Sequence, residues 1–389
     1  MRRTLAAASF LLAAWGAAFA WQESDFPPRP VVAYVLSLDP KDLNTVVGEP
    51  RSYTVSSGDT LYDIARHLGL GINEVTDAYP YLDVWLPPEG ETFAFPTTWV
   101  LPSSDYQGIV VNVPEMRLYY FRPTKGKDNV RTVVTYPVGL GRDDWQTPTG
   151  RFKVTEKTVD PTWVIPASIR EEHIRERGDP RELIPGGDPE NPLGRYRLRL
   201  SLPLYGIHGT NIPWGVGMEV SHGCVRLYPE DIERLFSIVP NGSPGEFVYQ
   251  PVKIGARDGD IYAEVHRDIY ETGIDYMTEA RNVLRDKGWE DFVDWGRLAD
   301  ALSEKGGTPI RVSEGRPLQS GERAPVRERH GEEARGDSPR LRDDSPQWSG
   351  DASLSGPADI STVDRSWLRR RRSLSSAPPV SPASSSSPR

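Results

Sequence analysis

Cys224 is the only thiol in the 389-residue chain, and polar residues surround it. It lies in the run Glu219-Val-Ser-His-Gly-Cys-Val-Arg-Leu227, and a second histidine, His208, precedes it by sixteen residues. A chain with one thiol cannot form an intramolecular disulfide, so this cysteine is either inert or kept for its chemistry. A thiol within reach of an imidazole can act as a cysteine nucleophile with a positioned base.

The N-terminus has the features of a secretory signal. Arg2 and Arg3 precede an uncharged apolar run from Leu5 to Phe19, and Ala18-Phe19-Ala20 offers the small residues of a cleavage site. The run is short for a membrane-spanning helix, so cleavage is favoured over anchoring. We therefore predict that residues 1–20 are removed, that no membrane span remains, and that the mature protein is periplasmic.

The charge of the chain is unevenly spread. Net charge is −9, with 14 arginines and 11 acidic residues in residues 308–389 but 30 basic and 44 acidic residues in residues 21–307. An acidic body repels a phosphate backbone, which argues against nucleic acid as a partner. Residues 307–389 are rich in Ser, Pro and Arg with few large apolar groups, and we predict that this tail is disordered.

Residues 51–97 are predicted to form a small βααβ module. Asp59 is a candidate N-cap for the first helix, and Gly69 is the residue that ends it. The predicted elements are a strand at 53–55, helices at 61–68 and 73–78, and a strand at 92–95.

Residues 108–254 are predicted to form a mainly β domain, because strand-like runs alternate with turn residues. One helix begins at Pro229, carries an apolar stripe as far as Val239, and is ended by Asn241-Gly242. Gly139-Leu-Gly141 is interpreted as a tight turn. The predicted strands lie at 109–113, 117–121, 130–138, 151–155, 196–200 and 246–250.

Residues 255–306 are predicted to form a C-terminal extension without chemistry of its own. It consists of a strand at 261–266 and two short amphipathic helices, with apolar residues at helical spacing over 274–284 and 292–302. We expect these helices to pack on the preceding β domain.

Two histidines are candidates for the base that activates Cys224. A free thiol has a pKa of about 8.5, so a neighbouring imidazole is needed to take its proton. His222 is only two residues away and the backbone limits its ring, whereas His208 approaches from another segment, so we favour His208. The carbonyl of Gly209 is a candidate to hold the other ring nitrogen and fix the tautomer.

The same segment supplies donors for a tetrahedral oxyanion. The backbone N–H groups of His222, Gly223 and Cys224 are the natural candidates, and Gly223 permits the backbone angles that would aim them. A zinc site built from His208, His222 and Cys224 is the main alternative. It lacks paired ligand spacing and a fourth ligand, so we predict neither metal nor cofactor.

These residues resemble a known family signature. His208-Gly-Thr-Asn211 followed by Ser221-His-Gly-Cys-Val-Arg226 resembles the L,D-transpeptidase catalytic domain, and residues 51–97 resemble a LysM module. The catalytic resemblance covers residues 109–252. Supporting runs match in order at Tyr136–Gly141, Thr147–Gly150, Asp160–Trp163 and Asn191–Gly194.

The resemblance implies a β-sandwich-like domain that acts on peptidoglycan. The cysteine would attack the bond after the third residue of a tetrapeptide stem, release D-alanine, and pass the acyl group to an amine of another stem peptide or of an outer-membrane lipoprotein. The LysM-like module would bind glycan strands. By position, the implied roles are Cys224 as nucleophile, His208 as base, Gly209 as its orienter, Ser221 and His222 as supporting residues, and His222, Gly223 and Cys224 as oxyanion donors.

Three further residues are candidate substrate contacts. Arg226 is proposed to meet a substrate carboxylate, with a structural salt bridge as the alternative. Trp214 and Tyr205 are candidate walls of the cleft, although aromatic residues in a β domain are more often core. Two other functions stay open: a hydrolase working through the same acyl-enzyme, and a non-catalytic wall-binding protein.

Overall fold

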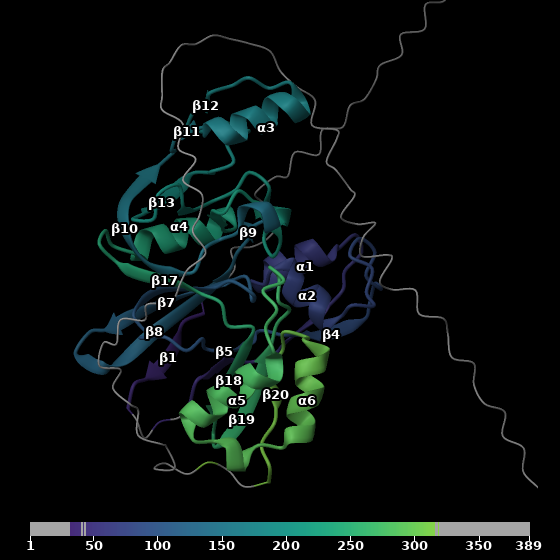
Figure 1. Cartoon of the computed structure of the whole chain (residues 1–389). Helices are drawn as coiled ribbons and strands as arrows, with labels where there is room; N and C mark the ends of the chain where they lie inside the picture. Colours follow the sequence, from purple (N-terminus) through teal and green to yellow (C-terminus); the bar gives the residue numbers. More distant parts are fainter. Residues whose placement is uncertain (1–31, 40–41, 43, 316–317, 319–389) are drawn as a thin grey trace, which may run out of the picture. The chain divides into compact units, whose positions relative to one another are not determined.

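The structure is a computed structural model that describes residues 32–39, 42, 44–315 and 318 (Figure 1). The predicted signal at 1–20 and nearly all of the predicted tail lie outside these residues. The described chain divides into two compact units, one made of residues 32–161 together with 186–318, and the other of residues 162–185. Within this part of the chain, no helix is both long and apolar enough to cross a bilayer.

A nine-stranded sheet forms the centre of the first unit. Its strands are antiparallel except for the pairs β6–β17 and β14–β16, which are parallel. Of the predicted strands, 196–200 is observed with the same bounds, and the others differ by a few residues at their ends. The order across the sheet is β1 (Tyr34–Ser37), β8 (Lys127–Pro137), β7 (Arg117–Thr124), β6 (Gly108–Asn112), β17 (Pro244–Val248), β10 (Gly150–Val159), β13 (Tyr196–Leu200), β14 (Gly206–His208) and β16 (Val225–Arg226).

The sheet closes over one apolar core, which confirms the predicted sandwich-like, mainly β fold. Val111 on β6 and Ile207 on β14 are fully buried in the same cluster, although they come from opposite halves of the sheet. The register of β10 against β13 shifts between Val154 and Glu156, and such an irregularity bends a strand. A bend at this strand lets the two halves of the sheet enclose one core.

Helix α4 (Pro229–Ile238) packs into this core through Ile232 and Leu235. It begins at the predicted residue but stops before the predicted Asn241-Gly242. Val239 already has extended backbone angles, φ −92° and ψ 115°. Pro240 follows it, and a residue before proline is disfavoured in the helical region, which explains the early end.

The predicted order of elements in residues 51–97 is observed. Strand β3 pairs with β4, and the N-cap of α1 is Thr60 instead of the predicted Asp59. Thr60 and Asp63 form a reciprocal capping box, while the Asp59 carboxylate accepts hydrogen bonds from Tyr53 Oη at 2.9 Å and from the Ser56 amide at 2.7 Å. The elements are β3 (Arg51–Thr54), α1 (Leu61–Leu68), α2 (Ile72–Ala78) and β4 (Thr92–Phe95).

This module shares a second core with the central sheet. Leu61 and Ile64 of α1 belong to the same buried cluster as Val110 and Tyr119 of the sheet. The central strands are therefore covered on both faces, because their alternate residues lie in the first core. Strands β2 (Val46–Gly48) and β5 (Thr98–Val100) form a two-stranded sheet beside it.

The C-terminal extension has a core of its own, so the prediction that its helices pack on the β domain is wrong. Ala280 and Leu284 of one helix and Leu298 of the other are buried against the last sheet. Val312, within the predicted tail, is fully buried, so this fold continues past the predicted boundary at 306. Its elements are β18 (Val252–Arg257), β19 (Asp260–Val265), α5 (Tyr276–Lys287), α6 (Trp295–Glu304) and β20 (Ile310–Arg311).

A buried cluster of charges joins this extension to the rest of the unit. Lys253 Nζ lies 2.8 Å from both the Glu115 and the Glu264 carboxylates and 2.7 Å from the carbonyl oxygen of Val100. His266 Nε2 lies 2.8 Å from the second carboxylate, Glu264. An ammonium between two carboxylates provides the pairing that buried charges require.

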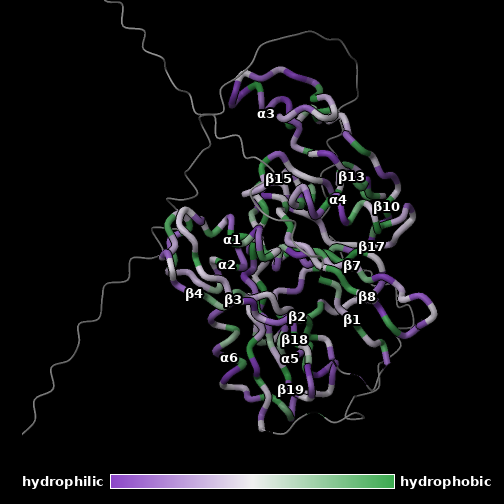
Figure 2. Tube along the Cα trace, turned by 180° about the vertical axis from the view of Figure 1, so that it is seen from behind, coloured by the Kyte–Doolittle hydropathy of each residue, from purple (hydrophilic) through white to green (hydrophobic). Residues whose placement is uncertain are grey.

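The second unit contains a helix for which the sequence gives no amphipathic signal. Helix α3 (Ala167–Arg177) has polar residues nearly all round, and it is drawn mostly in the hydrophilic colour in Figure 2. Ile169 packs with Ile165 and Ile184 in a small cluster. Strands β11 (Trp163–Val164) and β12 (Leu183–Ile184) pair beside it.

Candidate active site

The site residues lie on one face of three adjacent strands. His208 on β14 is the register partner of Arg197 on β13 and of Arg226 on β16. Side chains of register partners share a face of a sheet, whereas neighbours along a strand point to the opposite face. Ile207 and Val225, the alternating neighbours, are buried in the first core. The three strands thus present a row of arginine, histidine and arginine on the face away from that core.

Cys224 immediately precedes β16 and is half-buried. Because Val225 is the register partner of Ile207, the position beside Cys224 on β14 belongs to Gly206. The thiol lies 3.6 Å from the carbonyl oxygen of Leu204, to which it donates a hydrogen bond. Leu204 itself has a positive φ of 69°, a conformation that is uncommon for a residue with a side chain.

His208 is buried, and its ring is oriented by the backbone. Nδ1 lies 2.7 Å from the carbonyl oxygen of Gly209, the contact expected from the sequence. A carbonyl accepts only, so Nδ1 carries the proton and Nε2 is left as the basic nitrogen. Burial, followed by the positive charge of Arg226 and Arg197, lowers the pKa of His208 to about 3. The imidazole is therefore neutral near pH 7, as a general base must be.

The backbone before Cys224 is held by two side-chain hydroxyls. Ser221 Oγ donates to the carbonyl oxygen of Cys224 at 2.6 Å, and Thr147 Oγ1 donates to that of Gly223 at 3.0 Å. Gly223 has φ +95°, where a residue with a side chain would be strained. Within the described residues, the amides of Gly223 and Cys224 have no hydrogen-bond acceptor. Two fixed amide donors beside a thiol are the arrangement that stabilises an oxyanion.

Thr147 and Tyr270 are parts of the site that sequence reasoning missed. Tyr270 Oη donates to the Gly141 carbonyl oxygen at 2.8 Å and accepts from the Thr147 amide at 3.0 Å. Gly141 lies in β9 (Leu140–Gly141), which pairs with β15 (Glu219–Ser221), so its interpretation as a tight turn is wrong. A Cβ on Gly141 would lie 2.8 Å from the Cα of Gly223, and only glycine fits there.

The other predicted site residues lie in different surroundings. The ring of Tyr205 would be 2.7 Å from a Cβ on Gly223, so it packs against the backbone next to the thiol. The His222 ring packs edge-on against Trp145, with centroids 5.3 Å apart. Trp214 is half-buried against the second core, so its place in a substrate cleft stays a prediction.

The zinc alternative does not match the geometry. Among the described residues, the ligand atoms of His208, His222 and Cys224 do not all lie within 4.8 Å of one another, as ligands of one metal ion would. Glu115, Glu264 and His266 do form such a group, but the ammonium of Lys253 is hydrogen-bonded to both of its carboxylates.

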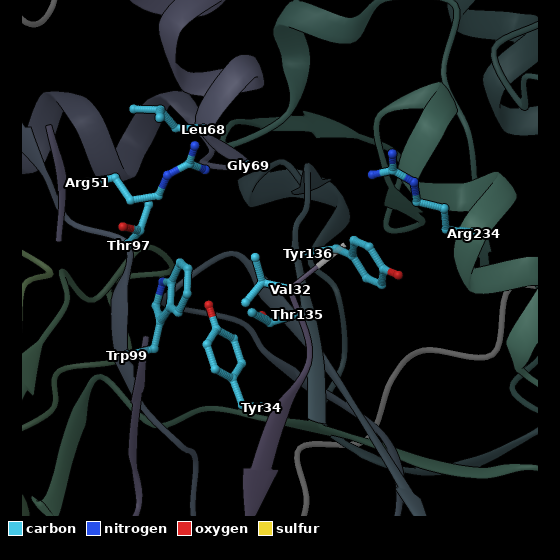
Figure 3. Close-up of a pocket in the computed structure, with 10 residues that line it drawn as sticks. All are labelled: Val32, Tyr34, Arg51, Leu68, Gly69, Thr97, Trp99, Thr135, Tyr136 and Arg234. Carbon is cyan, nitrogen blue, oxygen red and sulfur yellow. The ribbon is translucent and has the colours of Figure 1, made fainter. Parts of the chain in front are cut away.

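Two cavities of about 50 and 390 Å³ lie in the first unit, and neither is lined by Cys224 or His208. The smaller one is drawn in Figure 3, with Tyr34 and Trp99 side by side and Arg51 and Arg234 on opposite sides. Its volume is that of one or two water molecules.

Burial raises the pKa of the Cys224 thiol above its ordinary value, against the opposing effects of the Gly206 amide and of Arg226 and Arg197. We therefore expect alkylation of the native protein by iodoacetamide, an uncharged reagent that reacts with the thiolate, to keep accelerating above pH 9. In the urea-unfolded chain the rate should level off near the ordinary value. A native rate that levels off at or below pH 8.5 would contradict the resting thiol described above.

A thiol, an oriented imidazole and two free amides are the groups that acyl transfer by a cysteine requires. The family model for the YkuD-type L,D-transpeptidase catalytic domain matches residues 106–254. A probable L,D-transpeptidase of Salmonella typhimurium, ErfK/SrfK, is 35% identical over 288 residues, covering 72% of this chain and 91% of that protein. The chain belongs to the L,D-transpeptidase family.

Another relative and one solved structure complete the comparison. The probable L,D-transpeptidase YbiS of Escherichia coli K12 is 36% identical over 285 residues, covering 70% of this chain and 90% of that protein. The NMR structure of the catalytic domain of an Enterococcus faecium L,D-transpeptidase is 21% identical, with a TM-score of 0.27. It covers 38% of this chain and 100% of that domain.

Proposed function

We propose that this protein is a periplasmic L,D-transpeptidase that remodels peptidoglycan through an acyl-enzyme on Cys224. The acyl donor is a tetrapeptide stem, cut after its third residue with release of D-alanine. The acceptor is an amine, supplied by another stem peptide or by a lipoprotein lysine. The observation that carries this proposal is the Nδ1 contact of His208 with Gly209 O, because it leaves Nε2 free on the sheet face that carries the thiol.

The first half-reaction forms the thioester. The thiol proton passes to Nε2 of His208 while sulfur bonds to the carbonyl carbon of the donor. The carbonyl oxygen becomes an oxyanion and accepts hydrogen bonds from the amides of Gly223 and Cys224. When this intermediate collapses, the carbon–nitrogen bond breaks and His208 returns the proton to the leaving D-alanine.

The second half-reaction reverses these steps with a new amine. The acceptor amine gives a proton to His208 as its nitrogen bonds to the thioester carbon. The carbon–sulfur bond then breaks, and Cys224 recovers its proton from the imidazolium. In the resting enzyme the thiol donates to Leu204 O at 3.6 Å, and this hydrogen bond must open before the first half-reaction, which requires only rotation about the Cβ–Sγ bond.

The proposal is tested with the purified mature protein, a synthetic tetrapeptide donor and a second stem peptide as acceptor. We expect one D-alanine released for each cross-linked product, and a covalent thioester on the protein when the acceptor is left out. D-alanine release without cross-link, at a rate that the acceptor does not change, would instead establish a hydrolase on the same site. No D-alanine release from any donor would contradict both.

We also propose that the LysM-like module of residues 51–97 holds the glycan strand. Its loop between α2 and β4 exposes three large apolar side chains, with Tyr81 74%, Trp85 56% and Leu86 80% accessible. Exposed aromatic rings that cluster on one loop provide stacking surfaces for sugar rings, and isolated apolar residues do not.

Replacing Trp85 with alanine is expected to weaken sedimentation of the protein with purified, peptide-free glycan by about tenfold, because one stacking surface is lost. Val35 is also exposed, 74% accessible, and lies on β1, so Val35→Ala is the matched control and should bind like wild type. Equal binding by wild type and Trp85→Ala would contradict this placement of the glycan.

A further inference from the structure

Arg197 is a charged residue of the site to which the proposed mechanism gives no role. It lies on β13 directly beside His208, on the side opposite Arg226. Its side chain extends over Gly206, where a Cβ would come within 3.4 Å of Arg197 Nε. Cys224 is the neighbour of Gly206 on the next strand, so the Arg197 guanidinium faces the thiol across a position that has no side chain.

Within the described part of the chain, neither arginine has an anionic partner. Across residues 44–315 no carboxylate forms an ion pair with Arg197 or Arg226, and Nε of each is buried without a hydrogen-bond acceptor. The structural salt bridge considered for Arg226 is therefore not found among these residues. Burial lowers the pKa of the Arg226 guanidinium, which is the mark of a cation placed without its counter-charge.

Two half-buried guanidinium groups without counter-ions are costly unless an anion joins them. Other arginines of the unit do have such partners: Arg117 pairs with Glu74 at 2.6 Å, and Arg66 with Glu230 at 2.8 Å. A planar carboxylate suits the forked donors of arginine, and two arginines flanking one space can bind both of its oxygens.

We propose that Arg197 and Arg226 together bind a carboxylate of the acyl-donor peptide, one from each side of His208. This inference rests on the proposed function and deepens it, since it adds Arg197 and the charge of the donor. A stem tetrapeptide has two carboxylates near the scissile bond, the C-terminal one on the leaving residue and, where the third residue is a diamino acid, one on its side chain.

A bound carboxylate would also strengthen the base. The charged and titratable groups facing His208 are Arg197 from β13, Arg226 from β16 and Cys224, and both arginines lower its pKa. An anion between them offsets that effect and raises the pKa of the imidazole, so His208 accepts a proton more readily once the donor is in place. The acid limb of kcat should then lie at higher pH than the acid limb of kcat/KM.

The test compares three donors: the free tetrapeptide, its C-terminal carboxamide, and the peptide amidated on the third-residue side chain. D-alanine or D-alaninamide release is measured for wild type and for Arg197→Gln. Wild type should favour the free donor over one of the amides by about 10- to 100-fold in kcat/KM, the usual range for a lost charge-assisted hydrogen bond. The amide that loses activity identifies which carboxylate is bound.

Arg197→Gln should lose about the same factor on the free donor and little on that amide. Arg199→Gln is the matched control, because Arg199 lies two residues along the same strand, is exposed, and contacts Glu156 at 3.4 Å. Its kinetics should equal those of wild type. Thermal unfolding and the final extent of iodoacetamide alkylation of Cys224, neither of which involves the donor, report whether each variant keeps its fold and an accessible thiol. The extent is compared instead of the rate, because Arg197 lowers the pKa of Cys224 and its loss slows the reaction at a given pH.

Two results would overturn the inference while leaving the proposed function intact. One is a wild type that uses all three donors equally well. The other is an Arg197→Gln variant, folded and alkylated normally, that loses the same factor on the free and the amidated donors. A wild type that releases nothing from any donor contradicts the proposed function, and this inference with it.

Discussion

Replacing Cys224 with alanine is expected to abolish acyl transfer while leaving the fold unchanged. The thiol is half-buried immediately before β16, and within the described residues it donates one weak hydrogen bond, to Leu204 O. Its removal therefore changes the free energy of unfolding by no more than about 1 kcal/mol. Loss of a covalent nucleophile lowers kcat by on the order of 10⁴-fold or more. The measurement is D-alanine release from the tetrapeptide, alongside intact-mass detection of the thioester.

Cys224→Ser is the sharper comparison, since a hydroxyl has nearly the same shape but is a much weaker nucleophile. With His208 intact, the serine variant should bind donor as well as wild type does and still accumulate no acyl-enzyme. If either variant kept more than a few per cent of wild-type turnover, Cys224 would not be the nucleophile. In that case the amides and imidazole of this site would have to act with another reactive group.

Lys253→Met is expected to produce the largest loss of stability, about 3–5 kcal/mol in the free energy of unfolding. The substitution keeps an apolar stem of similar length and removes the ammonium that lies 2.8 Å from both Glu115 and Glu264. Two fully buried carboxylates would then face each other without a cation. Urea unfolding followed by tryptophan fluorescence measures the change, with Lys127→Met on the exposed end of β8 as the control.

The size of this loss should depend on pH. Burial by itself would raise the pKa of Glu264, but Lys253 and His266 outweigh it and hold the pKa below its ordinary value of 4.5. In wild type the contribution of this carboxylate is present above that value and is lost as pH falls through the lower native pKa. In Lys253→Met the native pKa lies above the unfolded one, so acid relieves the penalty. The difference between the two proteins should shrink from pH 7 to pH 4.

A compensating variant makes the stability prediction specific. In Lys253→Met/Glu264→Gln one carboxylate becomes a neutral amide, and most of the lost stability should return. If the double variant is as unstable as the single one, the deficit comes from lost packing of the lysine stem and not from unpaired charge.

The sequence predicted correctly the strands and helices whose own residues show a clear hydrophobic pattern. Tyr196–Leu200 and Thr92–Phe95 are strands with the predicted bounds, because β-branched, aromatic and alternating residues are bordered by turn residues there. Helix α3 (Ala167–Arg177) has no apolar stripe, and only a packing contact through Ile169 distinguishes it from a polar loop. The helices of the extension were predicted, but the surface on which they pack was not. They pack against the sheet β18–β19–β20, and its strand β20 lies in the segment that the sequence predicted to be a disordered tail.

The residues of the site likewise fall into those that the sequence predicted and those that it missed. Cys224 and His208 were found from the sequence because acyl transfer demands a thiol and an imidazole, and few of either occur in the chain. Thr147 and Arg197 were missed because their roles come from position. Thr147 meets Gly223 across 76 residues of chain, and Arg197 matters through its register opposite His208. Register between strands depends on the topology of the whole sheet, which no local pattern contains.

The lysine at the centre of the buried charge cluster has a practical consequence for exchanging parts between relatives. The family match ends at residue 254, in the middle of β18, which runs to Arg257. A chimera joined at 254 would keep Lys253 and Glu115 but take the residue opposite them, at position 264, from another protein. A chimera should therefore take this chain as far as β20. Lys253 then keeps both of its carboxylate partners, Glu115 and Glu264.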